Sequence, residues 1–252
     1  MRYIPALAVI ATVVLLLTPP LADPPALRLF VDGRALFGVP NFWNVVSNLP
    51  LLGVGAWGAL SVSRWRLLDP LERWPYFVAF LAIALTGIGS SYYHLMPLDD
   101  RLMWDRLPIA VSFMALVCAL AGDRLGGRSA VELLTPLVLL GAASVLYWRW
   151  SALYATENIV PYALVQYGGL LAIVILAARM PSRYTRTHDV VIAVALYVLA
   201  KIAELLDAPI YALGHLLSGH TVKHLLAALA AWWVLRMLLL RRPLGEQTRR
   251  IP

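Results

Sequence analysis

Two polar clusters interrupt an otherwise apolar chain, and each contains histidine. His220 and His224 are four residues apart, and on a helix this spacing directs both imidazoles from one face. Two nitrogens placed in this way can reach one ion at about 2.0–2.1 Å. His94, in the other cluster, would supply a third ligand from a neighbouring helix. Three histidines with an open fourth position are the pattern of a catalytic zinc site.

A hydroxyl and a carboxylate accompany His94. Ser90 lies four residues before His94, so both share a helical face, and its hydroxyl could donate a hydrogen bond to a developing oxyanion. Zinc lowers the pKa of bound water to about 7. Asp105 could take the proton from that water and return it to a leaving group. Alternatively, Asp105 orients a ligand histidine.

Further ionisable residues precede the second cluster. Lys201, Glu204 and Asp207 are spaced i, i+3 and i+6, so they lie along one side of a helix. For Lys201 and Glu204 we favour an internal ion pair that neutralises buried charge. Asp207 is a candidate partner that orients a ligand histidine. His215 lies five residues before His220 and is directed away from the pair, so we expect it at the rim of the site.

A third polar group opens the first predicted membrane helix. Asn44 and Asn48 are four residues apart, with Ser47 between them, so the two amides share one helical face. Within a membrane, such side chains usually hydrogen-bond between helices. We therefore expect them to join this helix to its neighbours.

Composition places this 252-residue chain in the membrane. Hydrophobic residues make up 61% and charged residues only 14%, against about 25% charged in a soluble domain. The mean hydropathy is +0.74. The net charge of +7 comes from arginines in short loops, which membrane topology and anionic lipids explain better than nucleic acid. The single cysteine, Cys118, excludes an intrachain disulfide.

The hydropathy pattern predicts an all-α, polytopic fold. Residues 1–22 form an apolar anchor or signal segment, residues 23–240 a membrane domain of seven helices, and residues 241–252 a basic cytoplasmic tail. The seven helices are expected at residues 42–62, 76–95, 105–120, 133–148, 159–178, 190–206 and 219–240.

Charges in the loops predict the orientation of these helices. Loops rich in arginine alternate with loops that are poor in it, and the rich ones are expected on the cytoplasmic side. The rich positions are Arg2, Arg64, Arg66, Arg73, Arg124, Arg128, Arg179, Arg183, Arg186, Arg241, Arg242, Arg249 and Arg250. The C-terminus is then expected on the cytoplasmic side.

This orientation brings the two polar clusters to one membrane depth. His94 ends its helix on the extracytoplasmic side, and Asp105, His220 and His224 begin theirs there. A His-x-x-x-His pair alone is a weak indication of metal. Ionisable groups in a membrane are energetically costly and usually functional. The predicted position of these four residues at one depth therefore strengthens the metal-site hypothesis.

Four segments give the chain a resemblance to the alkaline ceramidases, within the CREST superfamily of seven-helix membrane hydrolases. They match the first-helix motif, the Ser-x-x-x-His motif, the Asp-x-Leu-Pro motif and the final His-x-x-x-His helix of that family. In this chain they read NFWNVVSN at 41–48, GIGSSYYH at 87–94, DRLP at 105–108 and GHTVKHL at 219–225. The compact loops and the two-proline start resemble the bacterial branch, which implies a location in a bacterial inner membrane.

The resemblance implies a zinc ion held by His94, His220 and His224, with Ser90 and Asp105 beside it. It implies cleavage of the amide of a ceramide or another N-acyl lipid to a sphingoid base and a fatty acid. No nucleic-acid partner is implied, and the oligomeric state stays open.

Calcium is where this sequence departs from the animal family members. Their calcium site uses an acidic cluster and a glutamate directly before Phe-Trp-Asn. Here that position is Asn41, and only Asp23 and Asp32 are acidic upstream. Asp32 and Asn41 are thus at most a remnant of a Ca²⁺ site.

The competing interpretation is a receptor or sensor of the progestin–adipoQ and hemolysin III type, which would use the same metal structurally. A closed fourth coordination position would indicate the sensor, and one open to water beside a lipid-sized cavity would indicate the enzyme. A transporter would be expected to show inverted repeats, and the sequence has none.

Overall fold

A computed structural model describes residues 17–24, 29–61, 64–65 and 67–244. Across these residues all regular structure is helical, and pairing of extended backbone is limited to two isolated bridges. The all-α prediction is therefore confirmed. Most of the predicted N-terminal segment 1–22 and of the tail 241–252 lies outside the described residues.

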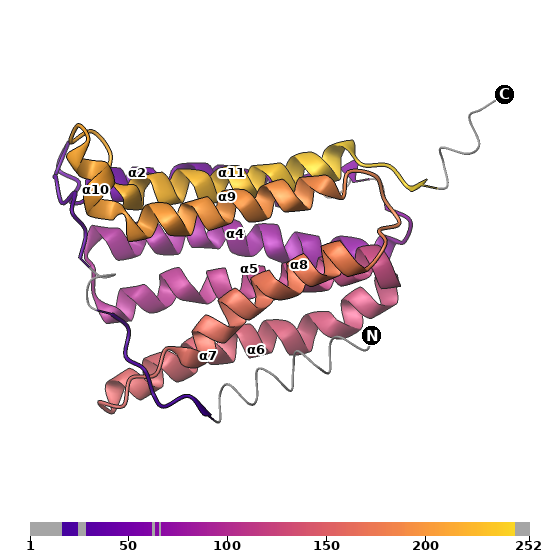
Figure 1. The fold of residues 1–252 in the computed structure, drawn as a ribbon, viewed down its shortest axis with the longest axis horizontal. Coiled ribbons are helices and arrows are strands. Elements are labelled where there is room, and N and C mark those ends of the chain that lie inside the picture. The colour runs from indigo at the N-terminus through magenta and orange to yellow at the C-terminus, as the bar shows by residue number, and fades with distance from the viewer. Residues whose placement is uncertain (1–16, 25–28, 62–63, 66, 245–252) are drawn as a thin grey trace.

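The helices follow one another through short connections (Figure 1). In order they are α2 (Phe42–Val46), α3 (Leu49–Leu60), η3 (Pro70–Glu72), α4 (Arg73–Leu95), α5 (Asp99–Leu125), α6 (Gly127–Leu153), α7 (Val160–Ala163), η4 (Leu164–Gly168), α8 (Gly169–Arg179), α9 (His188–Leu205), α10 (Asp207–Ala212) and α11 (Gly219–Leu240).

Five of the described helical segments are long and apolar enough to cross a membrane, which indicates an integral membrane protein. They are Pro70–Leu95, Asp99–Leu125, Gly127–Leu153, Val160–Arg179 and Gly219–Leu240. The predicted count of seven is not confirmed. Helix α3 has only 12 residues, about 18 Å at 1.5 Å per residue. Helix α9 has 18 residues but carries Asp189, Lys201 and Glu204.

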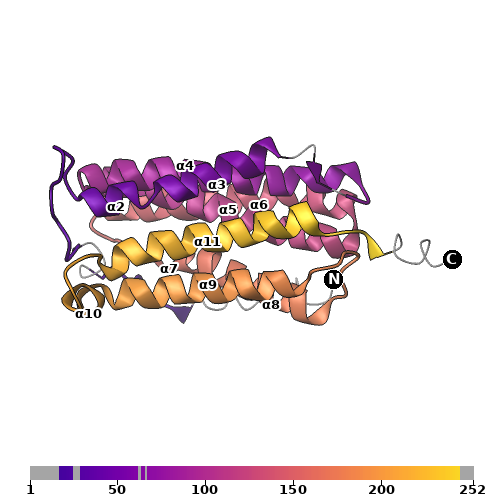
Figure 2. The ribbon, with the colours of Figure 1, turned by 90° about the horizontal axis from the view of Figure 1, so that it is seen from above.

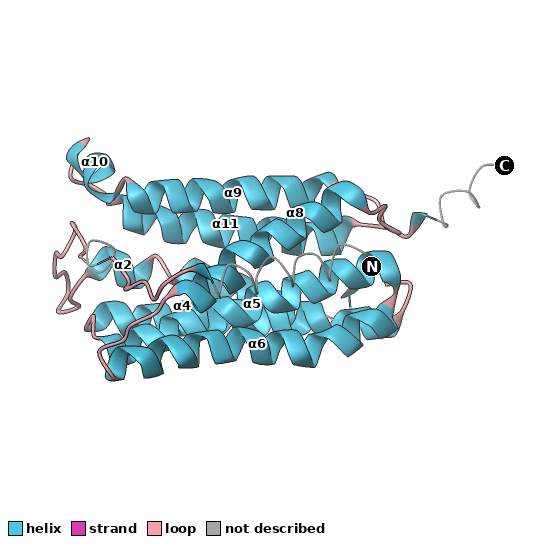
Figure 3. Ribbon diagram, turned by 60° about the horizontal axis from the view of Figure 1, so that its bottom comes forward, coloured by secondary structure: helices cyan, strands magenta, loops and turns pink. Residues whose placement is uncertain are grey.

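The long helices lie side by side as a bundle (Figures 1 and 3). Helix α4 packs between α3 and α5, α11 packs against α9 and α3, and α8 contacts both α5 and α9. This closes a ring of helices, whereas α6 packs on the outside of α5. The view from above separates α3 and α4 on one side from α8 and α9 on the other, with α11 between them (Figure 2). The ring encloses the cavity described below.

The structure corrects the start of the third predicted helix. Helix α5 begins at Asp99 rather than at Asp105. Asp99 and Asp100 occupy its first turn, where negative charge is favourable beside the helix dipole. Asp105 therefore lies in the second turn, and Pro108 is inside the helix rather than near its start.

A buried charge network joins the helix ends at the opposite end of the bundle from the histidines. Arg241 Nη1 donates to Asp123 Oδ2 at 2.6 Å, and the Tyr76 hydroxyl donates to the same oxygen at 2.7 Å. Nearby, Glu72 pairs with Arg183 and accepts from the Tyr184 hydroxyl. These contacts connect α4, α5 and the end of α11, so we interpret the network as a structural clamp.

Breaking this clamp is expected to destabilise the fold. In Asp123→Asn the buried Arg241 charge loses its partner, and removing one member of a buried pair costs about 3–5 kcal/mol. Unfolding in detergent micelles, followed by tryptophan fluorescence, measures the loss. Glu132→Gln is the control, because it breaks the exposed Arg128–Glu132 pair, worth only about 0.3–0.5 kcal/mol. Equal losses of unfolding free energy in the two variants would contradict the interpretation of the network as a clamp.

Candidate metal and catalytic site

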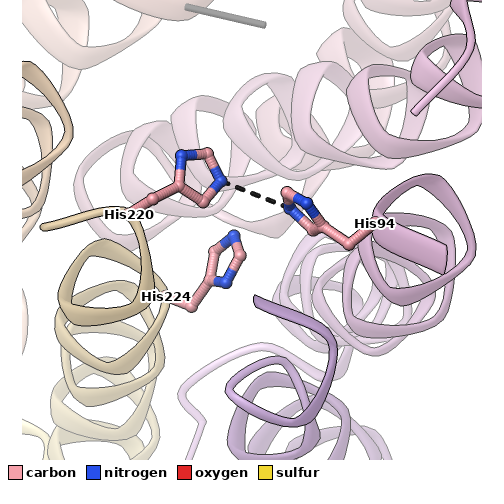
Figure 4. Close-up of side chains that lie close together, drawn as sticks. All are labelled: His94, His220 and His224. Atoms are coloured by element: carbon pink, nitrogen blue, oxygen red, sulfur yellow. Dashed lines mark hydrogen bonds between the residues drawn. The ribbon is translucent and has the colours of Figure 1, made fainter. Parts of the chain in front are cut away.

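Three buried histidines from two helices converge at one end of the bundle. His94 comes from the last turn of α4, and His220 and His224 come from the first turns of α11. One nitrogen from each ring lies within 4.8 Å of the others. Figure 4 shows the three rings facing a common centre. The structure thus brings together the three predicted ligands.

The geometry of the nitrogens fits a metal ion. His220 Nε2 and His94 Nε2 are 3.2 Å apart, and two ligands about 2.05 Å from a tetrahedral ion lie about 3.3 Å apart. His224 Nε2 is buried and has no hydrogen-bond partner among the described residues. A buried polar atom without a partner requires an explanation, and coordination of an ion supplies one here.

The other nitrogen of His224 is held by the turn between α2 and α3. The Ser47 hydroxyl lies 2.8 Å from His224 Nδ1 and the Asn48 amide nitrogen lies 3.3 Å from it. Such a contact to the distal nitrogen fixes the ring orientation of a metal ligand. Asn44 Oδ1 also accepts from the Thr221 hydroxyl at 3.0 Å. The predicted hydrogen bonds between helices are confirmed, and they converge on the histidine site.

The start of α11 is fixed by three local features. Ser218 caps the helix, since its side chain accepts from the backbone N–H of Thr221. Asp207 Oδ1 accepts from the backbone N–H of His220 at 2.7 Å. A Cβ on Gly219 would approach Ala203 O to 2.1 Å, so only glycine allows α11 to begin this close to α9 and α10.

Ser90 and Asp105 lie together on the wall of the cavity that contains His220 and His224. The Ser90 side chain lies close enough to the Asp105 carboxylate to act on its charge. A close approach of α4 and α5 makes this possible, because a Cβ on Gly89 would come within 2.1 Å of Trp104 O. Pro108 has no N–H to donate to that carbonyl, so the carbonyl can face α4.

The cavity has a volume of about 380 Å³ and continues far beyond the histidines. His220 and Met237 both line it, and 17 residues along a helix correspond to about 25 Å. Away from the histidines the wall is mainly aliphatic and aromatic, with Leu51, Ile83, Ile109, Phe113, Leu116, Leu120, Leu170, Ile173, Val194, Val234 and Met237. A polar head and an apolar tube suit a molecule with one reactive polar group and a long hydrocarbon chain.

The segment from Leu29 to Arg34 lies over the histidines. The Phe30 ring centroid is 4.6 Å from that of His94 and 4.7 Å from that of His220. Val31 N donates to Asp207 Oδ2 at 3.1 Å, so one carboxylate holds this segment and α11 together.

The Asp32–Arg34 pair anchors the same segment. Burial alone would raise the pKa of Asp32, but the hydrogen bonds and charge of Arg34 outweigh burial and hold the pKa below its usual value. Arg34 also donates to Leu216 O at 2.8 Å. The pair therefore ties the covering segment to the loop that precedes α11.

Four of the predicted peripheral residues serve other contacts. Asp207 holds the backbone of His220 rather than its ring. His215 is exposed and packs on Tyr211, in agreement with a position outside the ligand set. Asn41 donates to His94 O at 2.8 Å, and Asp32 pairs with Arg34. Asp23, also acidic in the same stretch, pairs with Arg106.

Sequence reasoning missed two contributors to the site, Lys223 and Phe30. The Lys201–Glu204 ion pair is present as predicted, but Lys223 joins it from α11. Lys223 Nζ lies 2.9 Å from His220 Nε2. The spacing of Lys223, three residues after His220 on the same helix, is the signal that could have indicated this contact. No sequence pattern links Phe30 to the histidines.

Comparison with known proteins gives a partial match. No family model matches the chain. The chain is similar to alkaline ceramidase 3 of Mus musculus, with 35% identity over 74 residues. This alignment covers 29% of the chain and 26% of the mouse protein, so the chain matches about a quarter of the length of that relative.

Proposed function

We propose that the protein is a zinc-dependent membrane amidase that hydrolyses the N-acyl amide of ceramide-like lipids. One observation carries the proposal: three buried histidines converge beside a Ser–Asp pair at the head of a long apolar cavity. The partial similarity to a ceramidase supports the same reaction class. A purely structural metal site, as in the sensor alternative, would need no cavity beside it.

The reaction adds water across the amide. The water oxygen bonds to the acyl carbon, the C–N bond breaks, and the products are a fatty acid carboxylate and a protonated sphingoid amine. Zinc held by His94, His220 and His224 would act as a Lewis acid and would lower the pKa of water. Asp105 takes the proton of the attacking water and delivers it to the leaving nitrogen. The Ser90 hydroxyl donates to the acyl oxygen as negative charge develops there.

The shape and lining of the cavity support one placement of the lipid. The acyl or sphingoid chain occupies the apolar tube that extends toward Met237, because removing hydrocarbon from water contributes about 25 cal/mol per Å². The amide then lies at the polar head of the tube, beside Asp105 and His224, which both line it. Specificity for acyl length would come from the length of this apolar tube.

The proposed orientation places this head on the extracytoplasmic side, with all seven helices crossing a bacterial inner membrane. In a Cys118→Ser background, a cysteine at Asp99 should react with an impermeant thiol reagent in intact cells. A cysteine at Arg183, at the other end of the bundle, should react only after lysis, because the basic loops are cytoplasmic. The reverse labelling pattern would contradict the proposed orientation.

Turnover of a fluorescent N-acyl-sphingosine by the purified protein in detergent micelles tests the function. We expect release of the fatty acid and of the free amine in equal amounts, abolished by a zinc chelator. No hydrolysis across short, medium and long acyl chains would favour the sensor.

A further inference from the structure

Lys223 brings a charged group within hydrogen-bond distance of one of the converging histidines. Its Nζ atom lies 2.9 Å from His220 Nε2 and 2.9 Å from Glu204 Oε1. The side chain is 17% exposed and lines the cavity. Glu204 is shared, because it also pairs with Lys201 on its own helix. The ammonium is therefore tethered to α9 on one side and directed at a candidate ligand atom on the other.

This contact is incompatible with a metal on the same nitrogen. A neutral imidazole has one acceptor nitrogen, and a metal ion on His220 Nε2 uses the lone pair that the ammonium contacts. With the ion bound, the ammonium must turn to another acceptor within reach of its tether. The cavity head is the space available, and the acyl oxygen of a bound amide lies there in the proposed function.

We propose that Lys223, held by Glu204, contributes its positive charge to the acyl oxygen of the substrate and to the carboxylate of the product. The inference rests on the proposed amidase function. An ammonium fixed in a site shielded from water stabilises developing negative charge more strongly than one in bulk water. Lys223 then acts together with Ser90, which also lines the cavity.

A packing role for the same residues is the competing explanation. Two lysines and one glutamate between α9 and α11 could simply neutralise buried charge. Lys201 separates these explanations, because it pairs with the same carboxylate but, of these two lysines in the described part of the chain, only Lys223 lies within hydrogen-bond distance of a site histidine. A purely structural network predicts similar effects for Lys201→Met and Lys223→Met, whereas our proposal predicts effects specific to Lys223.

Zinc affinity gives a readout that needs no turnover. The Lys223 ammonium repels a zinc ion bound beside it, so removing this positive charge should tighten zinc binding. We expect Lys223→Met to lower the zinc dissociation constant on the order of tenfold, measured by competition with a fluorescent chelator in detergent. Lys201→Met should change it much less. An unchanged or weaker zinc affinity in Lys223→Met would contradict a position of the ammonium beside the bound zinc ion.

Palmitate binding and turnover test whether the Lys223 ammonium stabilises negative charge on the product carboxylate and on the acyl oxygen of the substrate. In the zinc-loaded protein, Lys223→Met should bind palmitate about tenfold more weakly and lower kcat by about 10², with KM changed much less. Lys223→Arg keeps the charge and should restore palmitate binding. Lys223→Gln repeats the test if the methionine variant fails to fold.

Failure of the inference can be distinguished from failure of the function. Equal effects of Lys201→Met and Lys223→Met on zinc, palmitate and kcat would overturn the role of Lys223 and leave the amidase intact. A wild-type protein without amide hydrolysis would overturn the amidase. The zinc and palmitate measurements would still decide whether the Lys223 ammonium contacts a carboxylate bound beside the zinc ion.

Discussion

The His224→Ala protein is expected to hold no zinc and to hydrolyse no ceramide. His224 is buried, and its Nδ1 is held by Ser47. Its Nε2 faces the other two imidazoles and has no hydrogen-bond partner in the part of the chain that the structure describes. Removing one of three ligands leaves two imidazoles, fewer than a catalytic zinc site uses. Elemental analysis of the purified protein measures the zinc content, and the same preparation gives turnover.

His215→Ala is the matched control for the loss of a histidine. This residue is exposed and contacts Tyr211, so its zinc content and turnover should equal those of the wild type. We expect His94→Ala and His220→Ala to behave like His224→Ala. Full zinc content in any of these three variants would show that the ligand set is assigned wrongly.

Ser90→Ala and Asp105→Asn should keep zinc bound while turnover falls. Neither side chain belongs to the three-histidine cluster, so the metal is retained. Losing an oxyanion donor typically costs about 10²–10³ in kcat, and losing a general base costs about 10²–10⁴. Substrate affinity should change less, because the hydrocarbon chains contact the apolar tube rather than these groups.

Ser91→Ala is the control for Ser90→Ala. The Ser91 hydroxyl donates to Val45 O at 3.1 Å, and Ser91 does not line the cavity. Its turnover should therefore stay close to wild type. Wild-type turnover in Ser90→Ala and Asp105→Asn would refute the assigned roles, and loss of zinc in either would show that the residue also supports the metal.

Hydropathy and spacing were sufficient to predict the helical fold and the convergence of the three histidines. The i, i+4 spacing of His220 and His224 fixes their common face on α11. Loop charges predicted that His94 would lie at the same depth, and the structure places it at the same end of the bundle. The Lys201–Glu204 pair was also predictable, because residues three apart are neighbours on a helix surface.

Tertiary contacts explain what the sequence could not predict. The start of α5 at Asp99 depends on a first turn that carries no hydrophobic periodicity. Phe30 reaches the histidines because Asp207 and Arg34 hold its segment in place. Lys223 lies inside the GHTVKHL segment, whose spacing draws attention to the two histidines. Its position beside His220 depends on Glu204, which comes from another helix.

Zinc-dependent recovery of amide hydrolysis tests the central claim most directly. The protein is stripped with a chelator, assayed with N-acyl-sphingosine, and then titrated with zinc while turnover is measured. We predict that activity is absent in the stripped protein and rises in proportion to bound zinc, with full activity at about one ion per chain. Hydrolysis that persists in the stripped protein, or no hydrolysis at full zinc occupancy, would contradict the account.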